Sequence, residues 1–298
     1  MKNGLTPQGV YVSLVTPFRD NEVAYDLLKE NIRLLQQTDV SGFLVLGGNA
    51  ETHGMNSFEK LEIVKIVKEN STKKQIIVGI SADSSRLAIE EIEKLDKNLV
   101  DYVRVLPPHY FAKSMTREIL YRFYSEVADS SKLPIILYHV PKLTNGVEFS
   151  ADMVKDLARH QNIVGIKDSS ADGIYGFIAS TCTFSDFAVL AGSANTFYPA
   201  LVSGAAGGNM TVANYLPDMC CSLYENYKNG DLEQARKLYF TLYTINKYVS
   251  GKLGIAGIKA AMTILGYHGG EPRSPIRALD NAAVENLKVR LDEMLSEF

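Results

Sequence analysis

The stretch PIILYHVPKLTNGVEFSADMVKDLARHQNIVGIKDS, residues 134–169, contains two short apolar runs joined by a segment of helical character. Short apolar runs bounded by turn residues are typical of buried β-strands. The same alternation recurs along the chain in units of about 25 to 30 residues, which is the pattern of a (β/α)8 barrel. The sequence therefore predicts an α/β fold, a (β/α)8 TIM barrel with a C-terminal helical extension.

Eight apolar runs are the expected strands of this barrel. They are residues 9–18, 42–47, 75–80, 102–107, 134–140, 163–169, 187–193 and 207–212. A doubly wound open sheet is the alternative, but the chain has no dinucleotide-binding glycine fingerprint. From about residue 215 onward only helical patterns remain. We therefore expect the barrel in residues 1–225 and a C-terminal helical domain in residues 226–298.

The composition narrows the class of protein. The 298 residues are 46% hydrophobic and carry a formal net charge of −3, which disfavours nucleic-acid and membrane partners. No apolar run approaches the roughly 20 residues of a membrane-spanning helix, and the first ten residues lack the core of a signal peptide. Cys182, Cys220 and Cys221 are too few for a disulfide framework. We expect them to be reduced core residues of a cytoplasmic protein.

Lys167 stands in an apolar run where another valine would be expected. Strand alternation places Gly165, Lys167 and Ser169 on one face and Asp168 on the other. An unpaired lysine that faces the barrel interior would be desolvated, and its lowered pKa would make it an amine nucleophile. A structural lysine paired with a buried carboxylate is the other interpretation. Strand position alone leaves both open.

The neighbouring strands supply candidate partners for Lys167. Tyr138 falls at nearly the same height, where a phenol could transfer protons as a carbonyl becomes an imine. It could instead be a core tyrosine with a satisfied hydroxyl. On the other side, Gly192 leaves room for a ligand. His139 points to the opposite face from Tyr138, and no histidine has the spacing of a metal ligand, so we expect neither a metal nor an organic cofactor.

Other segments could bind an anion or fill structural roles. The backbone N–H groups of Gly48 and Asn49 could hold a carboxylate, although Gly-Gly-Asn is also an ordinary turn. The glycine-rich ends of the seventh and eighth strands, where Asn209 lies, could instead hold the phosphate of a phosphosugar isomerase or aldolase. Lys259 follows a helical pattern that predicts a snorkelling surface lysine. Ser57 is the expected N-cap of the helix that follows it.

Arg104 shares a strand face with Tyr102 and Leu106 in the run YVRVLP. The valines on the other face suit packing against helices, which turns Arg104 toward the barrel interior. An inward arginine requires an anion, either a protein carboxylate or a carboxylate on the substrate. If the anion is a carboxylate on the substrate, the substrate would be a dicarboxylate.

The segments ILYHVP, NIVGIKDSS, LGGNAE and LPPHYF together resemble the pyruvate-dependent class I aldolase family. That family contains dihydrodipicolinate synthase, N-acetylneuraminate lyase, 2-keto-3-deoxy sugar-acid aldolases and 4-hydroxy-2-oxoglutarate aldolase. The resemblance covers nearly the whole chain and implies a barrel with a C-terminal helical domain, assembled as a homotetramer of two tight dimers. It implies a Schiff-base lyase that joins pyruvate and an aldehyde, or cleaves the bond between them, without a cofactor.

The resemblance also implies roles for individual residues. Lys167 matches the Schiff-base lysine, and Tyr138 matches the tyrosine that moves protons at the substrate. Gly48 and Asn49 occupy the positions that bind the pyruvyl carboxylate. Tyr110 matches a tyrosine that reaches across the dimer into the neighbouring site. The remaining substrate-binding candidates are Ser169, Gly192, Asn209 and Arg104.

Some positions depart from the family pattern. Gly48 has no hydroxyl for a proton relay, Ala50 replaces a usual glycine, and Leu143 stands where dihydrodipicolinate synthase carries an arginine for the aldehyde's carboxylate. Asn49 and Ser169 most resemble the 4-hydroxy-2-oxoglutarate aldolase branch, which is the expected activity. The alternatives are dihydrodipicolinate synthase, N-acetylneuraminate lyase, a 2-keto-3-deoxy sugar-acid aldolase, or a catalytically inactive relative that binds pyruvate.

Overall fold

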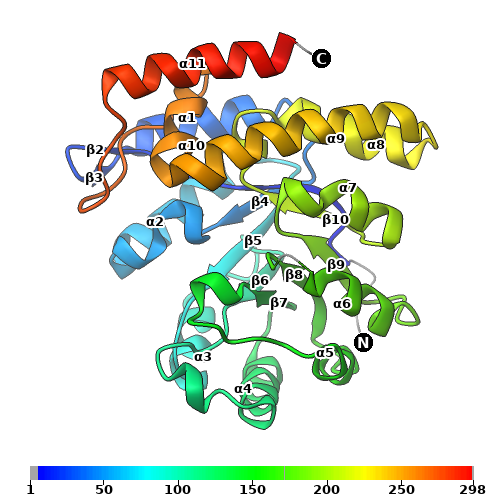
Figure 1. Ribbon diagram of the computed structural model, residues 1–298. Helices are drawn as coiled ribbons and strands as arrows, with labels where there is room; N and C mark the ends of the chain where they lie inside the picture. The colour runs from blue at the N-terminus through cyan, green and yellow to red at the C-terminus, as the bar shows by residue number, and fades with distance from the viewer. Residues whose placement is uncertain (1–5, 171, 297–298) are drawn as a thin grey trace. The chain divides into compact units, whose positions relative to one another are not determined.

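The computed structural model describes residues 6–170 and 172–296. Its strands form a closed barrel in the order β1-β10-β9-β8-β7-β6-β5-β4 (Figure 1). The barrel strands are β1 (Gly9–Ser13), β4 (Gly42–Val45), β5 (Gln75–Ile80), β6 (Tyr102–Val105), β7 (Ile135–His139), β8 (Ile163–Asp168), β9 (Ala188–Ala191) and β10 (Gly207–Met210). Each lies within one of the eight runs expected to be strands, so the predicted barrel is confirmed. A two-stranded ribbon, β2 (Phe18–Arg19) and β3 (Glu22–Val23), follows β1.

Helices alternate with the barrel strands and continue after the last one. The α-helices are α1 (Tyr25–Leu35), α2 (Ser57–Glu69), α3 (Ser85–Glu93), α4 (Arg117–Ser130), α5 (Ala151–Leu157), α6 (Gly173–Thr181), α7 (Ala194–Ser203), α8 (Pro217–Lys228), α9 (Leu232–Asn246), α10 (Leu253–Ile264) and α11 (Asn281–Ser296). Shorter helical segments are η1 (Gly48–Ala50), η2 (Thr52–Gly54), η3 (Ala112–Ser114), η4 (Pro141–Leu143), η5 (Val212–Asn214) and η6 (Lys247–Lys252). The C-terminal helical extension is thus confirmed, whereas a domain boundary at residue 225 stays a prediction.

The chain forms two compact units, and the first is built around Gln75–Asn209. Strands β5 to β9 run parallel in it, with Tyr138 beside Lys167 and His139 beside Asp168 in the register of β7 and β8. Helices α3 to α7 each pack against the next one along the chain (Figure 1). Serine and threonine side chains cap α3, α4, α5 and α7 by accepting a backbone N–H in the first turn.

Gly165 explains how closely β8 and β9 approach each other. A Cβ at this position would lie 2.5 Å from the carbonyl oxygen of Ala188 on β9. No side chain fits there, so the glycine is required by the strand packing itself. The backbone of β9 therefore fills the space beside Gly165.

The second unit comprises Gly9–Lys74 and the residues from Met210 onward. In it β1 pairs with β4, α8 packs along α9, and α11 packs against α9 and α10 (Figure 1). The N-cap of α2 is Asn56, which forms a capping box with Glu59, so the expected cap at Ser57 is wrong by one residue. An asparagine oxygen reaches the third backbone N–H of the helix as well as a serine hydroxyl does.

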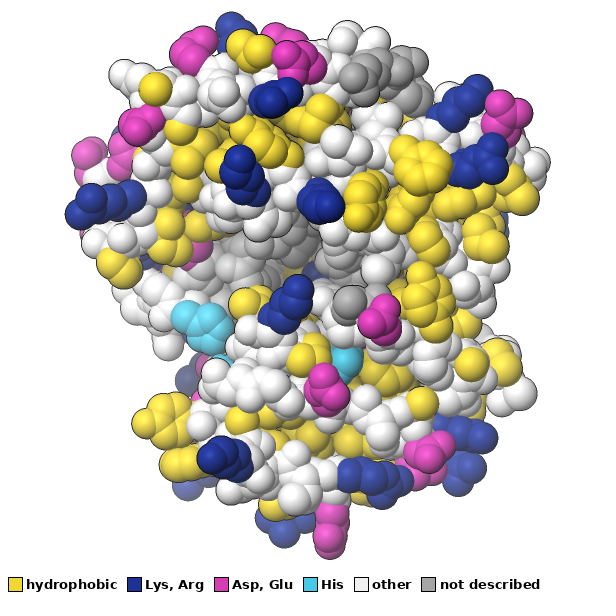
Figure 2. Space-filling model, viewed as in Figure 1, with side chains coloured by type: hydrophobic (Ala, Val, Ile, Leu, Met, Phe, Trp, Pro, Cys, Tyr) yellow, Lys and Arg dark blue, Asp and Glu magenta, His cyan; other side chains and the backbone are white. Residues whose placement is uncertain are grey.

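Two surface features bear on the function classes. Among the described residues, no helix is long and apolar enough to cross a membrane. On the face drawn in Figure 2, acidic and basic side chains are interspersed and do not gather into one basic patch. All three cysteines are free, but Cys182 is exposed at the end of α6, so the expectation that all three lie in the core is wrong for this residue.

Candidate active site

Lys167 and Tyr138 lie side by side on β8 and β7, as the sequence predicts. They are register partners, both are buried, and the Lys167 Nζ lies 5.2 Å from the centre of the Tyr138 ring. Nζ donates a hydrogen bond of 3.2 Å to Oδ1 of Asn209 on β10. Among the residues that the structure describes, Lys167 has no carboxylate partner. The interpretation of a structural ion pair is therefore wrong.

The surroundings of Lys167 favour its neutral form. Burial lowers the pKa of the Lys167 amine well below its usual range, and the positive charge of Arg104 lowers it further. Only the unprotonated amine has the lone pair that attacks a carbonyl carbon. The site thus favours the neutral amine that imine formation requires.

Arg104 lies on the same side of the strands as Tyr138, as its place in the run YVRVLP predicts. Its guanidinium carbon lies 4.1 Å from the centre of the Tyr138 ring, and the side chain is 2% exposed. Leu106 and Val140 complete the apolar contacts around Tyr138. A guanidinium and the Lys167 amine therefore lie near one aromatic ring.

Ser169 and Gly192 lie where β8 and β9 end. The Gly192 N–H donates to the Asp168 carbonyl oxygen at 2.6 Å, and a Cβ at Gly192 would collide with Oγ of Ser169. The space beside Gly192, which we expected to be open for a ligand, is thus occupied by Ser169. The serine itself is partly exposed beyond the strand end, and its contact with substrate stays a prediction.

Gly48 and Asn49 belong to the second unit and form the first turn of η1, directly after β4. The Asn49 side chain donates to Oγ1 of Thr211. The N–H groups of Ala50 and Glu51 bond back to the carbonyls of Gly47 and Gly48, at 3.1 and 3.0 Å. The first N–H groups of a helical turn have no partner within the turn, so those of Gly48 and Asn49 are suited to an anion.

Comparison with known proteins identifies the family. The sequence pattern of the dihydrodipicolinate synthetase family matches residues 6–294. The chain belongs to this family. Its members are pyruvate-dependent lyases and aldolases that work through a Schiff base, so this protein is an enzyme of that class.

Named relatives and solved structures agree with this family. The chain is 31% identical to the 4-hydroxy-tetrahydrodipicolinate synthase of Leptospira biflexa, covering 94% of this chain and 95% of the relative. The dihydrodipicolinate synthase structure from Thermotoga maritima aligns with a TM-score of 0.91 at 26% identity, covering 97% and 99% of the two chains. The 4-hydroxy-tetrahydrodipicolinate synthase of Methylacidiphilum fumariolicum SolV aligns with a TM-score of 0.88 at 28% identity, covering 98% of each.

Lys259 is, like Lys167, a buried lysine among the described residues, so the expectation of a surface lysine is wrong. Its side chain is 1% exposed, and Nζ lies 2.6 Å from the Glu51 carboxylate. Nζ also donates to the carbonyl oxygens of Thr16 and Glu271, at 2.9 and 2.6 Å. Helix α10 consists mostly of apolar residues and is largely buried in the second unit, so the Lys259 side chain does not reach the surface. Lys259 is a fully bonded structural cation.

The ion pair of Lys259 fixes the end of η1. Glu51 adopts a left-handed backbone conformation at φ 58°, and its carboxylate also accepts the backbone N–H of Arg273 at 2.8 Å. Arg273 in turn pairs with Glu59 at 2.6 Å. These bonds connect the turn of Gly48 and Asn49 to α10, α2 and the segment before α11 within one unit.

Replacement of Lys259 should destabilise the fold. We expect Lys259→Met to lower the free energy of unfolding by about 3–5 kcal/mol, because it leaves the Glu51 carboxylate buried without its cation. Urea unfolding measures the change. The double variant Lys259→Met, Glu51→Gln should recover part of the loss, whereas a single-variant loss below about 1 kcal/mol would contradict the structural role.

His139 and Asp168 form a buried pair that the sequence analysis missed. Nδ1 of His139 lies 2.5 Å from Oδ1 of Asp168, and the Ser170 hydroxyl donates to Oδ2 at 2.9 Å. The imidazole ring contacts the rings of Phe149 and Phe177. The pair joins β7 and β8 one residue beyond Tyr138 and Lys167, on the opposite face. The sequence could have indicated this pair, because His139 follows Tyr138 and Asp168 follows Lys167 on neighbouring strands.

Tyr110 lies outside this cluster. Its side chain is 75% exposed, in the loop after β6, and it stacks edge-on with Phe111 at 4.9 Å between ring centres. The backbone N–H of Tyr110 donates to the Asp83 carboxylate at 3.1 Å, which fixes the loop. A role inside a neighbouring subunit stays a prediction for this residue.

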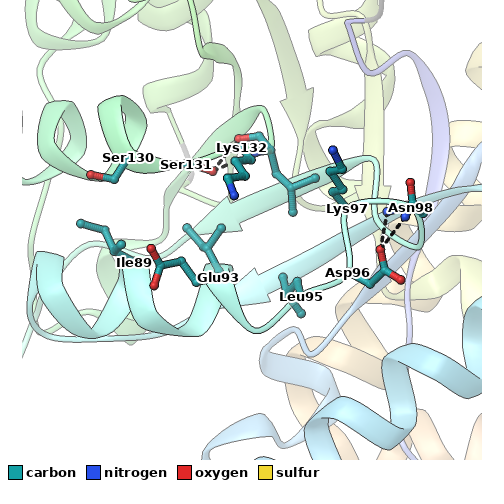
Figure 3. A pocket seen from close by; sticks show the side chains of 11 residues that line it. Ile89, Glu93, Leu95, Asp96, Lys97, Asn98, Ser130, Ser131 and Lys132 are labelled. Carbon is teal, nitrogen blue, oxygen red and sulfur yellow. Dashed lines mark hydrogen bonds between the residues drawn. The ribbon is translucent and has the colours of Figure 1, made fainter.

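The first unit also has a surface hollow of about 400 Å³ between the ends of α3 and α4 (Figure 3). It is lined by residues such as Glu93, Asp96, Asn98 and Lys132. These residues precede β6 and β7, so the hollow lies at the amino ends of the strands. Catalytic groups of such barrels lie at the carboxyl ends, and this hollow is therefore not the active site.

Proposed function

We propose that the protein joins pyruvate to an aldehyde, or cleaves the product, through an imine on Lys167. The observation that carries this proposal is a buried lysine with no carboxylate partner among the described residues, beside Tyr138 and hydrogen-bonded to Asn209. A neutral amine at the carboxyl end of a barrel strand is suited to attack on a keto carbon.

The reaction follows from this geometry. The Lys167 amine adds to the keto carbon of pyruvate, and loss of water gives the protonated imine. Water takes a proton from the methyl carbon to give an enamine, which attacks the carbonyl carbon of the aldehyde. Tyr138 donates a proton to the aldehyde oxygen as the C–C bond forms. Water then releases the product and regenerates the amine, and cleavage is the reverse sequence.

The pyruvyl carboxylate requires its own binding site. We assign it to the N–H groups of Gly48 and Asn49, as the resemblance implies. The left-handed turn at Glu51 and the Asn49–Thr211 hydrogen bond hold these groups in a fixed turn. Such a turn binds an anion without further rearrangement.

The acceptor that the comparisons favour is that of 4-hydroxy-tetrahydrodipicolinate synthase. Relatives at about 30% identity carry this name, which supports this activity better than the expected 4-hydroxy-2-oxoglutarate aldolase. One observation keeps the aldolase as a second candidate. Leu143 stands where the synthase carries an arginine for the acceptor's carboxylate, and this leucine is 64% exposed.

A panel of aldehydes and 2-keto acids, assayed for consumption or release of pyruvate, tests the proposal. We expect turnover with at least one carboxylated aldehyde. Pyruvate binding with no turnover on any member would instead identify an inactive relative. A requirement for a phosphorylated sugar would support the phosphosugar enzyme.

We further propose that the protein is a cytoplasmic homotetramer. Tyr110 and Phe111 are exposed aromatic side chains on a loop held by Asp83, a surface suited to a subunit interface. Sedimentation velocity at micromolar concentration should show a tetramer, because the exposed rings gain apolar burial on association. An active monomer under these conditions would contradict the assembly.

A further inference from the structure

Arg104 is a buried guanidinium without an acidic partner. Its side chain is 2% exposed, and Nε and Nη1 are buried with no hydrogen-bond acceptor among the described residues. The charged or ionisable groups that act on it are Tyr138 and Tyr124, and neither is a carboxylate. Of the two anions that the sequence left open, a carboxylate of the described residues is therefore not the partner of Arg104.

This arrangement is unfavourable for the empty protein. Burial of an unpaired charge costs free energy, and an arginine side chain does not avoid this cost by losing its proton, because it stays protonated in proteins. The pKa of Arg104 is lowered by burial, and the neighbouring group near the same Tyr138 ring is the Lys167 amine, which carries no negative charge. Because no described residue supplies a counter-charge here, an anionic ligand completes the site.

The register of the strands places this cation close to the reacting amine. Arg104 pairs with Ile136 on β7, two residues before Tyr138, and its guanidinium reaches forward over the Tyr138 ring. The ring lies 4.1 Å from the guanidinium carbon and 5.2 Å from the Lys167 Nζ. One small molecule bonded to Nζ can therefore also contact the guanidinium.

We propose that Arg104 binds a second carboxylate of the substrate, beyond the pyruvyl unit, and so selects 2-keto acids with two carboxylates. This proposal rests on the imine at Lys167. A guanidinium donates charge-assisted hydrogen bonds to a carboxylate, and Nε and Nη1 of Arg104 are buried donors without an acceptor among the described residues. Arg104 thereby replaces the arginine that is missing at Leu143.

Reductive trapping with borohydride tests this inference without requiring turnover. The probes are pyruvate, 2-oxopentanoate and 2-oxoglutarate, the last two having equal length and differing in one terminal carboxylate. The proteins are the parent, Arg104→Met, Arg104→Lys and the control Arg122→Met, which removes an exposed guanidinium on α4. The measurement is the concentration of each acid that half-saturates modification of Lys167.

For the parent and for Arg122→Met, we expect 2-oxoglutarate to half-saturate modification of Lys167 at a much lower concentration than 2-oxopentanoate does. Arg104→Met should remove this preference. The half-saturating concentration of 2-oxoglutarate should rise on the order of 10- to 100-fold, which is the scale expected for loss of a charge-assisted hydrogen bond. Arg104→Lys should recover part of the preference for 2-oxoglutarate, because lysine restores the positive charge but lacks the planar guanidinium. The half-saturating concentration of pyruvate should change by no more than a few-fold. The thermal midpoint of Arg104→Met should not fall, because no carboxylate among the described residues loses its cation.

Three results would overturn the inference. A parent that traps both five-carbon acids equally shows that no second carboxylate is bound. An equal loss on all three acids in Arg104→Met assigns the guanidinium to the pyruvyl carboxylate. A lower thermal midpoint together with loss on all acids makes Arg104 structural. Failure of the parent to trap pyruvate at all would instead refute the proposed function.

Discussion

Replacement of Lys167 by alanine should abolish turnover while leaving the fold intact. Loss of the nucleophile removes the imine itself, so we expect kcat to fall at least about 10⁴-fold. The fold should survive because the amine is buried with only one hydrogen bond, to Asn209, and no ion pair among the described residues. Steady-state assay and urea unfolding of the same preparation separate the two effects.

The second buried lysine is the matched control. Lys259 is as deeply buried as Lys167 but is bonded to Glu51 and two carbonyl oxygens. Lys259→Met should therefore lose stability and still form an adduct with pyruvate on Lys167. Loss of stability in Lys167→Ala equal to that in Lys259→Met, or substantial residual turnover, would contradict the assignment of the nucleophile.

The pH dependence of imine formation follows from the lowered pKa of Lys167. An exposed lysine loses its proton near about pH 10.4. Because burial and Arg104 lower the pKa of Lys167, its neutral fraction rises and saturates at lower pH. The rate of pyruvate trapping should thus reach its plateau well below pH 10. In Arg104→Met the midpoint should move upward, since one cause of the lowered pKa is removed.

Tyr138→Phe should lower turnover by roughly 100-fold or more, the usual scale for loss of an acid–base group. The substitution keeps the ring, so the contacts with Arg104, Leu106 and Val140 remain. Proton transfer at the aldehyde oxygen should fail, whereas the Lys167 amine should still form an imine. Steady-state kinetics, with pyruvate trapping as the control, measures the difference.

Two results would argue against Tyr138 as the proton donor. Activity within a few-fold of the parent would show that the tyrosine only packs against its neighbours. Equal losses of turnover and of pyruvate trapping would show that the ring positions Lys167 rather than moving a proton.

The barrel and the Lys167–Tyr138 pair could be predicted because each depends on local pattern. The eight apolar runs determine the strands, and period-two alternation brings Tyr138, Lys167 and Arg104 to one side. Strands that follow one another in the chain are neighbours in such a barrel. The sequence therefore predicted Tyr138 beside Lys167, and the two residues are register partners in the structure.

Features that depend on contacts between distant segments were not predictable. Lys259 was expected at the surface because its own helix does not reveal the Glu51 carboxylate that reaches it from the end of η1. The same holds for Gly192, because Ser169, which follows β8, occupies the space beside it. The partner of Arg104 was left open because no local pattern indicates whether a carboxylate lies nearby.

The most direct test of the account is to locate the adduct that pyruvate forms under borohydride. Peptide mapping by mass spectrometry after trapping should find one modified residue, Lys167, and no modification of Lys259. An adduct on any other lysine, or none at saturating pyruvate, would contradict the imine at Lys167.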